Sequence, residues 1–62
     1  MFNNNLKTIR KLKNLSQQEL AKKLNVSFKT ISHWEIGYSE PSLFFLTKLV
    51  EILNVSYEEL LD

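Results

Sequence analysis

The chain has 62 residues, no cysteine and one histidine, so it can form one domain that has neither a disulfide nor the ligands of a structural zinc site. Glycine and proline occur once each, which favours helices over hairpins, and there is no run of about 18 apolar residues that could cross a membrane. The net charge of +1 is unevenly placed, with a basic N-terminal half and an acidic C-terminal end, and this polarity suits a polyanionic partner on one side.

Five helices are predicted from the apolar spacing and from the residues that begin and end helices. Ser16, Ser27, Ser42 and Ser56 each precede a helical pattern, as residues that cap helix N-termini do. Ser16 and Ser56 are each followed three positions later by a glutamate, which predicts a capping box. Gly37 is predicted to stop the third helix in the left-handed conformation. The expected helices span about residues 4–13, 17–24, 28–36, 43–53 and 57–61.

The first predicted helix has an apolar stripe of Phe2, Leu6 and Ile9, and Arg10 lies close to that stripe. In the third helix Glu35 likewise lies on the apolar side. A charge in an apolar surface is costly unless it is paired. We therefore expect Arg10 and Glu35 to pair and to tie the first helix to the third, the alternative being that both side chains extend into solvent.

The second predicted helix places Leu20, Ala21 and Leu24 on one face. Ala21 is small, which would let the third helix cross closely. The connection to the third helix is Asn25-Val26-Ser27, and such a short turn between two short helices is typical of a helix-turn-helix. Asn25 is predicted to adopt the left-handed conformation, and Val26 to fill the corner between the two helices.

The third predicted helix has an apolar inner face, formed by Ile31 and Trp34. The opposite face is polar and has no carboxylate; it consists of Lys29, Ser32 and His33, with Phe28 at its leading end. A face of this kind suits the major groove of duplex DNA. The sequence therefore predicts a helix-turn-helix from about Gln17 to Ile36, in which residues 28–36 form the recognition helix.

The fourth predicted helix is apolar on almost every side, and its expected core positions are Leu43, Leu46, Leu49, Val50 and Leu53. Further large apolar side chains lie around it, at Phe44, Phe45 and Ile52. One helix of a small domain cannot bury every face internally, so the excess predicts a surface for a partner beside Tyr57 and Leu61. The alternative is that Phe45 and Ile52 complete the core.

Several segments of the chain together form one recognisable pattern. They are Leu15–Ala21 (LSQQELA), Val26-Ser27, Thr30–Gly37 (TISHWEIG), Glu40–Leu43 (EPSL) and Leu53–Ser56 (LNVS). The pattern resembles the phage repressor/Cro family of helix-turn-helix regulators, known as the XRE family, over about residues 5–61. The resemblance implies an all-α fold, a compact five-helix lambda-repressor-like DNA-binding domain that residues 1–62 form as a single unit.

Site residues follow from the resemblance position by position. Gln17 matches a residue that contacts phosphate and braces the recognition helix, although it also fits an ordinary polar residue at a helix start. The positions that face DNA bases match Phe28, Lys29 and His33, and the neighbouring positions with DNA-binding roles match Ser27, Thr30 and Ser32. A structural ion pair of the family matches Arg10 and Glu35, and the family's dimer surface matches Phe44, Phe45, Tyr57 and Leu61.

Phe28 departs from the family, whose base-facing positions are often Gln, Asn or Arg. Phenylalanine cannot make a bidentate contact with a base, but it can pack on the methyl group of thymine. Lys29 can donate to guanine or to phosphate, and His33 can donate or accept a hydrogen bond. The alternative for Phe28 is a place in the core.

Together these features predict a transcriptional regulator, expected to be a repressor, that binds a double-stranded DNA operator as a homodimer. A cytoplasmic, nucleoid-associated protein is expected, because no apolar signal segment follows Met1 and cysteine is absent. No cofactor, metal site or membrane contact is predicted. No catalytic residue is predicted either, because the position of Glu58 and Glu59 in the first turn of a helix is explained by the helix dipole. The alternative function is an antitoxin-like or other protein-interaction module that uses the apolar fourth helix.

Overall fold

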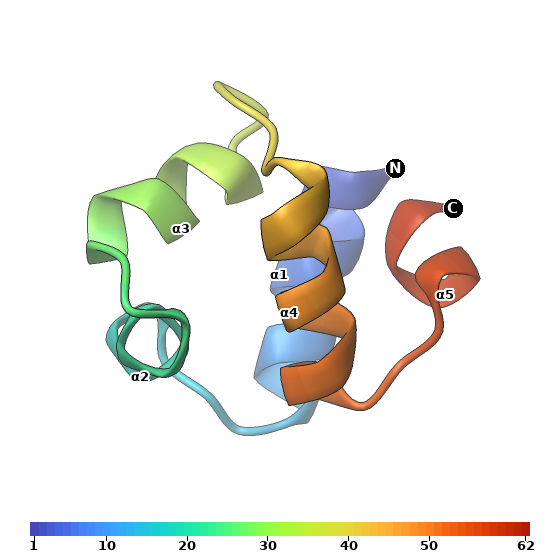
Figure 1. Ribbon diagram of the computed structural model, residues 1–62, viewed down its shortest axis with the longest axis horizontal. Coiled ribbons are helices and arrows are strands. Elements are labelled where there is room, and N and C mark those ends of the chain that lie inside the picture. Colours follow the sequence, from blue (N-terminus) through green and yellow to red (C-terminus); the bar gives the residue numbers. More distant parts are fainter.

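Five α-helices and no strand make up the structure, a computed structural model that describes residues 1–62 (Figure 1). In chain order the helices are α1 (Phe2–Leu12), α2 (Gln17–Leu24), α3 (Phe28–Glu35), α4 (Leu43–Leu53) and α5 (Tyr57–Leu61). The predicted all-α fold of five helices is confirmed. Helix α1 begins and ends earlier than predicted, and α3 ends one residue earlier. None of the helices is long and apolar enough to cross a lipid bilayer.

The helices from α2 onwards begin at the serines predicted to cap them. Each hydroxyl accepts a hydrogen bond from the backbone N–H three residues later; the four caps are Ser16, Ser27, Ser42 and Ser56. Both predicted capping boxes form, because Glu19 accepts from the Ser16 N–H at 2.8 Å and Glu59 from the Ser56 N–H at 3.0 Å. The bond from Ser16 favours the charged carboxylate and so holds the pKa of Glu19 below its ordinary value.

Three of the four connections between helices share one tripeptide pattern. They are Asn14-Leu15-Ser16, Asn25-Val26-Ser27 and Asn54-Val55-Ser56, which we call the Asn–apolar–Ser connectors. Each asparagine lies in the left-handed region, with φ of 60°, 60° and 57°, and this conformation ends the helix before it. Each apolar residue packs against the core, and each serine caps the next helix. One tripeptide thus stops a helix, anchors the chain and starts the following helix.

The core lies between all five helices. Its buried apolar residues are Leu6, Leu20, Ala21, Leu24, Ile31, Trp34, Leu49, Leu53 and Leu60. Phe45 and Ile52 pack on this cluster and are partly buried, as the second interpretation of α4 predicts. The prediction that Leu43 belongs to the core is wrong, because this side chain is 73% exposed. Leu43 is the first residue of α4, and the segment before it lies largely at the surface, so that no element covers this end of the helix.

Helices α1 and α4 lie in the middle of the molecule, with α2 and α3 on one side and α5 on the other (Figure 1). Helix α3 packs on α1 and α2, whereas α5 packs on α1 and α4. The two ends of the chain meet beside α5, where the Met1 amine donates to the Asp62 carbonyl at 3.3 Å. Asn5 joins α1 to α5, because its Nδ2 donates to the Leu60 carbonyl at 3.1 Å. This arrangement leaves the outer face of α3 free of other helices.

Candidate nucleic-acid interface

The inner face of α3 is fixed in the core by two large side chains. Ile31 and Trp34 are both buried, as the helical spacing predicts. The Trp34 indole lies against the Phe45 ring of α4, with ring centroids 5.7 Å apart and a tilt of 52°. Ala21 of α2 is also buried, and its small side chain lets α2 and α3 pack closely. These contacts determine which residues of α3 point away from the protein.

A buried ion pair joins α1 to the end of α3, as the apolar faces predict. Arg10 and Glu35 form a bidentate contact, in which Nε donates to Oε2 at 2.5 Å and Nη2 donates to Oε1 at 3.0 Å. The remaining guanidinium nitrogen, Nη1, donates to the Leu15 carbonyl at 2.7 Å. The hydrogen bonds to Glu35 raise the pKa of Arg10 above its ordinary value, despite the opposing effect of burial. Both charges are therefore satisfied inside the protein.

Gln17 connects the start of α2 to the same carboxylate. Its Nε2 donates to Oε1 of Glu35 at 3.0 Å, so the side chain braces α3 from the neighbouring helix. Glu35 thus accepts hydrogen bonds from both Arg10 and Gln17, and no buried side-chain nitrogen or oxygen of the protein lacks a partner. The network holds α3 in one orientation relative to α1 and α2.

The outer face of α3 presents four of the predicted DNA-binding residues. Phe28 is 48% exposed and Lys29 is exposed, while Ser32 and His33 are half-buried. Phe28 therefore lies outside the core, and the alternative that assigned it there is wrong. Because Glu35 is the only carboxylate of α3 and points inward, the outer face has no negative charge that would repel a phosphate.

The leading end of α3 is held by two hydroxyls that the sequence also assigns to the site. Ser27 Oγ lies 3.1 Å from Thr30 Oγ1, and it accepts a hydrogen bond from the Thr30 N–H at 3.3 Å. The Ser27 hydroxyl therefore caps the helix, and the Thr30 hydroxyl lies within hydrogen-bonding distance of it. They lie beside Phe28 and Lys29 in the first turn, where the positive end of the helix dipole favours an anion.

Tyr38 is a neighbour of the site that the sequence patterns do not indicate. Its ring packs on the ring of His33, with centroids 4.8 Å apart and a tilt of 50°. The contact results from the way α3 ends. Gly37 has φ +78°, and the Tyr38 N–H donates to the His33 carbonyl at 2.9 Å while the Gly37 N–H donates to the Trp34 carbonyl at 3.3 Å. This is the Schellman arrangement, which brings the residue after the glycine back over the last turn of the helix.

Comparison with known protein families identifies the family to which this chain belongs. The sequence matches the family described as helix-turn-helix over residues 6–60, a span that contains the ion pair, α2 and α3. The chain belongs to the helix-turn-helix family. The resemblance to the XRE family that the sequence motifs indicate is confirmed by this match and by the relatives that follow.

Two relatives and one solved structure show how far the similarity extends. YqaE of Bacillus subtilis (strain 168), an HTH-type transcriptional regulator, is 41% identical over 98% of this chain and 53% of its own length. The HTH-type transcriptional activator BcrR of Enterococcus faecalis is 40% identical over 98% of this chain and 30% of its own length. The chain therefore spans about half or less of these relatives. The crystal structure of SinR, the master regulator for biofilm formation, in complex with DNA matches with a TM-score of 0.90 and 38% identity, covering both chains fully.

The α4–α5 side of this helix-turn-helix domain contains the residues that the sequence assigns to a dimer surface. Phe44 and Tyr57 are 62% and 43% exposed. Phe44 lies under the Lys48 ammonium, at 5.6 Å from Nζ to the ring centroid, and Tyr57 donates to Thr47 Oγ1 at 3.1 Å. Phe45, in contrast, is half-buried between Trp34 and Phe44. Leu61 is 47% exposed, so Phe44, Leu61 and Tyr57 are all more accessible than Phe45.

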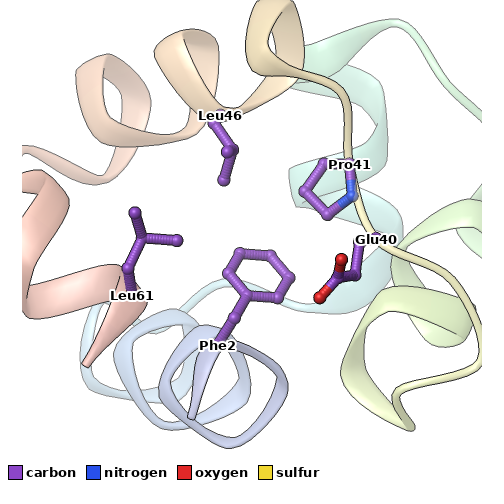
Figure 2. A pocket seen from close by; sticks show the side chains of 5 residues that line it. All are labelled: Phe2, Glu40, Pro41, Leu46 and Leu61. Carbon is purple, nitrogen blue, oxygen red and sulfur yellow. The ribbon is translucent and has the colours of Figure 1, made fainter.

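Leu61 belongs to a small cleft between α1, α4 and α5. Figure 2 shows the side chains of Phe2, Leu46 and Leu61 pointing toward one another, with Glu40 and Pro41 closing one side. The cleft has a volume of about 100 Å³, well below that of a typical small-molecule site. A second cleft of about 310 Å³ adjoins it near Trp34 and Gly37, and Glu40 is the only carboxylate that lines either cleft.

No group of three acidic, histidine or cysteine side chains gathers anywhere in the chain to bind a metal ion.

Proposed function

We propose that this helix-turn-helix domain binds specific sequences of double-stranded DNA and acts in transcriptional regulation, with α3 in the major groove. The observation that carries the proposal is the contrast between the two faces of α3. Its inner face is fixed by Ile31, Trp34 and the buried Glu35, so that a rigid outer face without negative charge is presented to solvent. The match to SinR, whose structure is a complex with DNA, supports DNA binding by this fold.

The outer residues of α3 supply different contacts in this proposal. Lys29 donates to the O6 and N7 atoms of guanine or to a phosphate, and His33 donates to or accepts from a base edge. Phe28 packs on thymine methyl groups, so that part of the recognition is apolar contact. Gln17 uses its free amide capacity on a phosphate while it braces Glu35, and Ser27, Thr30 and Ser32 contribute from the flank.

We further propose that two copies bind a roughly palindromic operator and repress transcription by occupying it. A two-fold dimer places its recognition helices about 34 Å apart, which is one turn of DNA. The surface between the copies consists of the exposed Phe44, Tyr57 and Leu61 and the half-buried Phe45. A cytoplasmic location in contact with the nucleoid is part of the same proposal, because the operator is there.

Selection from random duplexes tests the function directly. The domain is mixed with random DNA fragments at low salt, bound fragments are recovered by gel shift, and sequencing gives the site together with its symmetry and spacing. We expect one enriched sequence with two half-sites. If no fragment shifts at low salt, the proposal fails and a protein-interaction role for α4 is favoured instead.

Lys29→Ala tests the role of α3 in base recognition. Loss of a guanine contact should relax the preference at one position and weaken binding to the selected site by roughly fivefold to a hundredfold. Competition between the selected duplex and duplexes altered at single positions measures this preference. Lys13→Ala is the matched control: Lys13 is exposed at the end of α1, away from α3, and we propose that it contacts a DNA phosphate, so its loss should lower affinity about equally for all sequences. An equal loss for every duplex with Lys29→Ala would refute its role at a base.

A further inference from the structure

The contact between Tyr38 and His33 is a feature of the site that DNA binding by α3 does not itself require. Tyr38 is 76% exposed, so its ring is not held by the core. It is held by the backbone at the end of α3, where Gly37 turns the chain and the Tyr38 N–H donates to the His33 carbonyl. The same residue therefore supplies the carbonyl that fixes Tyr38 and the imidazole on which the Tyr38 ring rests.

We infer that Tyr38 is a positioning residue for base recognition, because it restricts the His33 imidazole to one orientation on the outer face of α3. The inference deepens the proposed function and rests on it. A histidine side chain on the outer face of a helix samples several rotamers, and ordering it on DNA costs conformational entropy. A ring at 4.8 Å removes part of that freedom before DNA arrives. Tyr38 thus strengthens the contact made by His33 without forming a base contact of its own.

The surroundings of the pair support this assignment. The other aromatic contacts of the protein, Trp34 with Phe45 and Phe44 with Phe45, involve α4, and neither includes a residue from the outer face of α3. The Tyr38 hydroxyl has no hydrogen-bonding partner within the protein, whereas that of Tyr57 donates to Thr47. Within the protein, Tyr38 therefore acts through the packing of its ring on His33, and a phenylalanine would supply the same ring.

A double-mutant cycle on the duplex selected by the wild-type domain tests the inference. Tyr38→Ala should weaken binding about threefold to tenfold, because an aromatic contact of this kind contributes that much. It should also relax base preference at the position that His33→Ala relaxes. Tyr38→Phe should bind within about twofold of wild type, and in a His33→Ala background Tyr38→Ala should have no further effect. Leu12→Ala removes an exposed apolar side chain from the end of α1 and is the control for general effects.

Three results would overturn the inference. They are unchanged binding by Tyr38→Ala, an equal loss for Tyr38→Ala in the His33→Ala background, and a loss with Tyr38→Phe as large as with Tyr38→Ala. The last two would mean that Tyr38 contacts DNA directly. Failure of the wild-type domain to select any duplex would instead refute the proposed function.

Nuclear magnetic resonance of the free domain then tests the contact by itself. Tyr38→Ala should move the His33 ring proton resonances through loss of the ring current, and Tyr38→Phe should leave them nearly unchanged. The Trp34 indole resonance should stay in place in both variants, which shows that the fold is intact. Unchanged His33 resonances in Tyr38→Ala would overturn the inference even without DNA.

Discussion

Glu35 is the residue on which the orientation of α3 depends most. Its two oxygens accept hydrogen bonds from Arg10 of α1 and Gln17 of α2, so that one carboxylate joins three helices. Because Arg10 also donates to the Leu15 carbonyl, the network includes the connector between α1 and α2. Buried charges of this kind add little net stability compared with apolar residues of similar size. Their value here is a defined angle between α3 and its neighbours.

Removing one partner of the ion pair should be far more costly than removing both. Arg10→Met and Glu35→Met each leave a buried charge without its partner, and each should lower the free energy of unfolding by about 3 kcal/mol. The double variant should lie within about 1 kcal/mol of wild type, since no unpaired charge remains. Urea denaturation at low temperature measures the three values. Losses that simply add in the double variant would contradict the coupling.

At the scale of elements, the helices are separated by residues that combine several tasks. In each Asn–apolar–Ser connector the asparagine has the left-handed conformation, which asparagine adopts more readily than most other residues with a side chain. The only connection without this tripeptide is the one between α3 and α4, where Gly37 has the left-handed conformation and the chain runs through residues 36–42. The local sequence therefore specifies where four helices stop, independently of their packing.

Substitution of Asn25 tests whether the left-handed conformation matters. Asn25→Ala should lower the free energy of unfolding by about 1 kcal/mol, because alanine adopts a φ of +60° less readily than asparagine does. Asn25→Gly should match wild type or exceed it slightly, since glycine has no such strain. Thermal or urea denaturation gives both values. Asn4→Ala, at an exposed position within α1, is the matched control and should change stability little. Equal losses for alanine and glycine at position 25 would rule the explanation out.

The capping box of α2 should make stability depend on pH in the acidic range. The pKa of Glu19 is lowered in the folded protein, so the folded state binds fewer protons than the unfolded state in that range. The stabilisation from this carboxylate is complete above the unfolded pKa of about 4.3 and is lost as the pH falls through the lower folded value. Glu19→Gln keeps an acceptor for the Ser16 N–H but cannot titrate, and it should flatten the acidic part of the stability curve.

Denaturation midpoints of wild type and Glu19→Gln between about pH 2 and pH 6 measure the effect, since the stabilisation begins to be lost below the unfolded pKa of about 4.3. Glu51→Gln is the control, because Glu51 is exposed on α4 and forms no hydrogen bond through its side chain. Parallel curves for wild type and Glu19→Gln would show that the capping box does not couple to protonation.

At the scale of the whole molecule, folding separates the basic and the acidic side chains in space. Arg10 and Glu35 cancel in the interior, so neither contributes to the outer surface. On α1 to α3 and their connectors the remaining charges are six exposed lysines and Glu19, whereas the part from residue 40 onward is acidic apart from Lys48. Figure 1 places the acidic α5 on the opposite side of α1 and α4 from α2 and α3. In the proposed binding mode, with DNA at α3, this placement keeps the repulsion between α5 and the DNA small.

This charge distribution predicts a steep salt dependence of DNA binding. The logarithm of the association constant should fall linearly with the logarithm of salt concentration, with a slope of about −0.9 for each phosphate contacted. Removal of one such contact, as expected for Lys13→Ala, should reduce the slope by about one unit. Titrations from about 50 to 200 mM salt measure it. A response that hardly varies with salt would show that phosphates do not contribute to binding.

Most of this architecture is encoded locally and could be predicted from the sequence. The serine caps, the inward Ile31 and Trp34 and the pairing of Arg10 with Glu35 all follow from helical spacing and from the cost of an unpaired charge. The exposure of Leu43 could not be predicted, because spacing alone does not show that no other element covers the start of α4. The contact of Tyr38 with His33 also depends on the path of the chain after Gly37, and residue types alone do not specify that path.

The connector Asn25-Val26-Ser27 also limits how this domain can change during evolution. All three residues have a structural task, so a deletion there removes a helix stop, an anchor or a cap. An inserted residue that extended α2 would turn the rest of the motif by about 100°, and α3 would no longer present the same side chains outward. We therefore expect an insertion between Ile36 and Ser42 to disturb α3 less than one between α2 and α3. If α3 reads DNA as proposed, a change of target that keeps this geometry is made by replacing side chains on the outer face of α3.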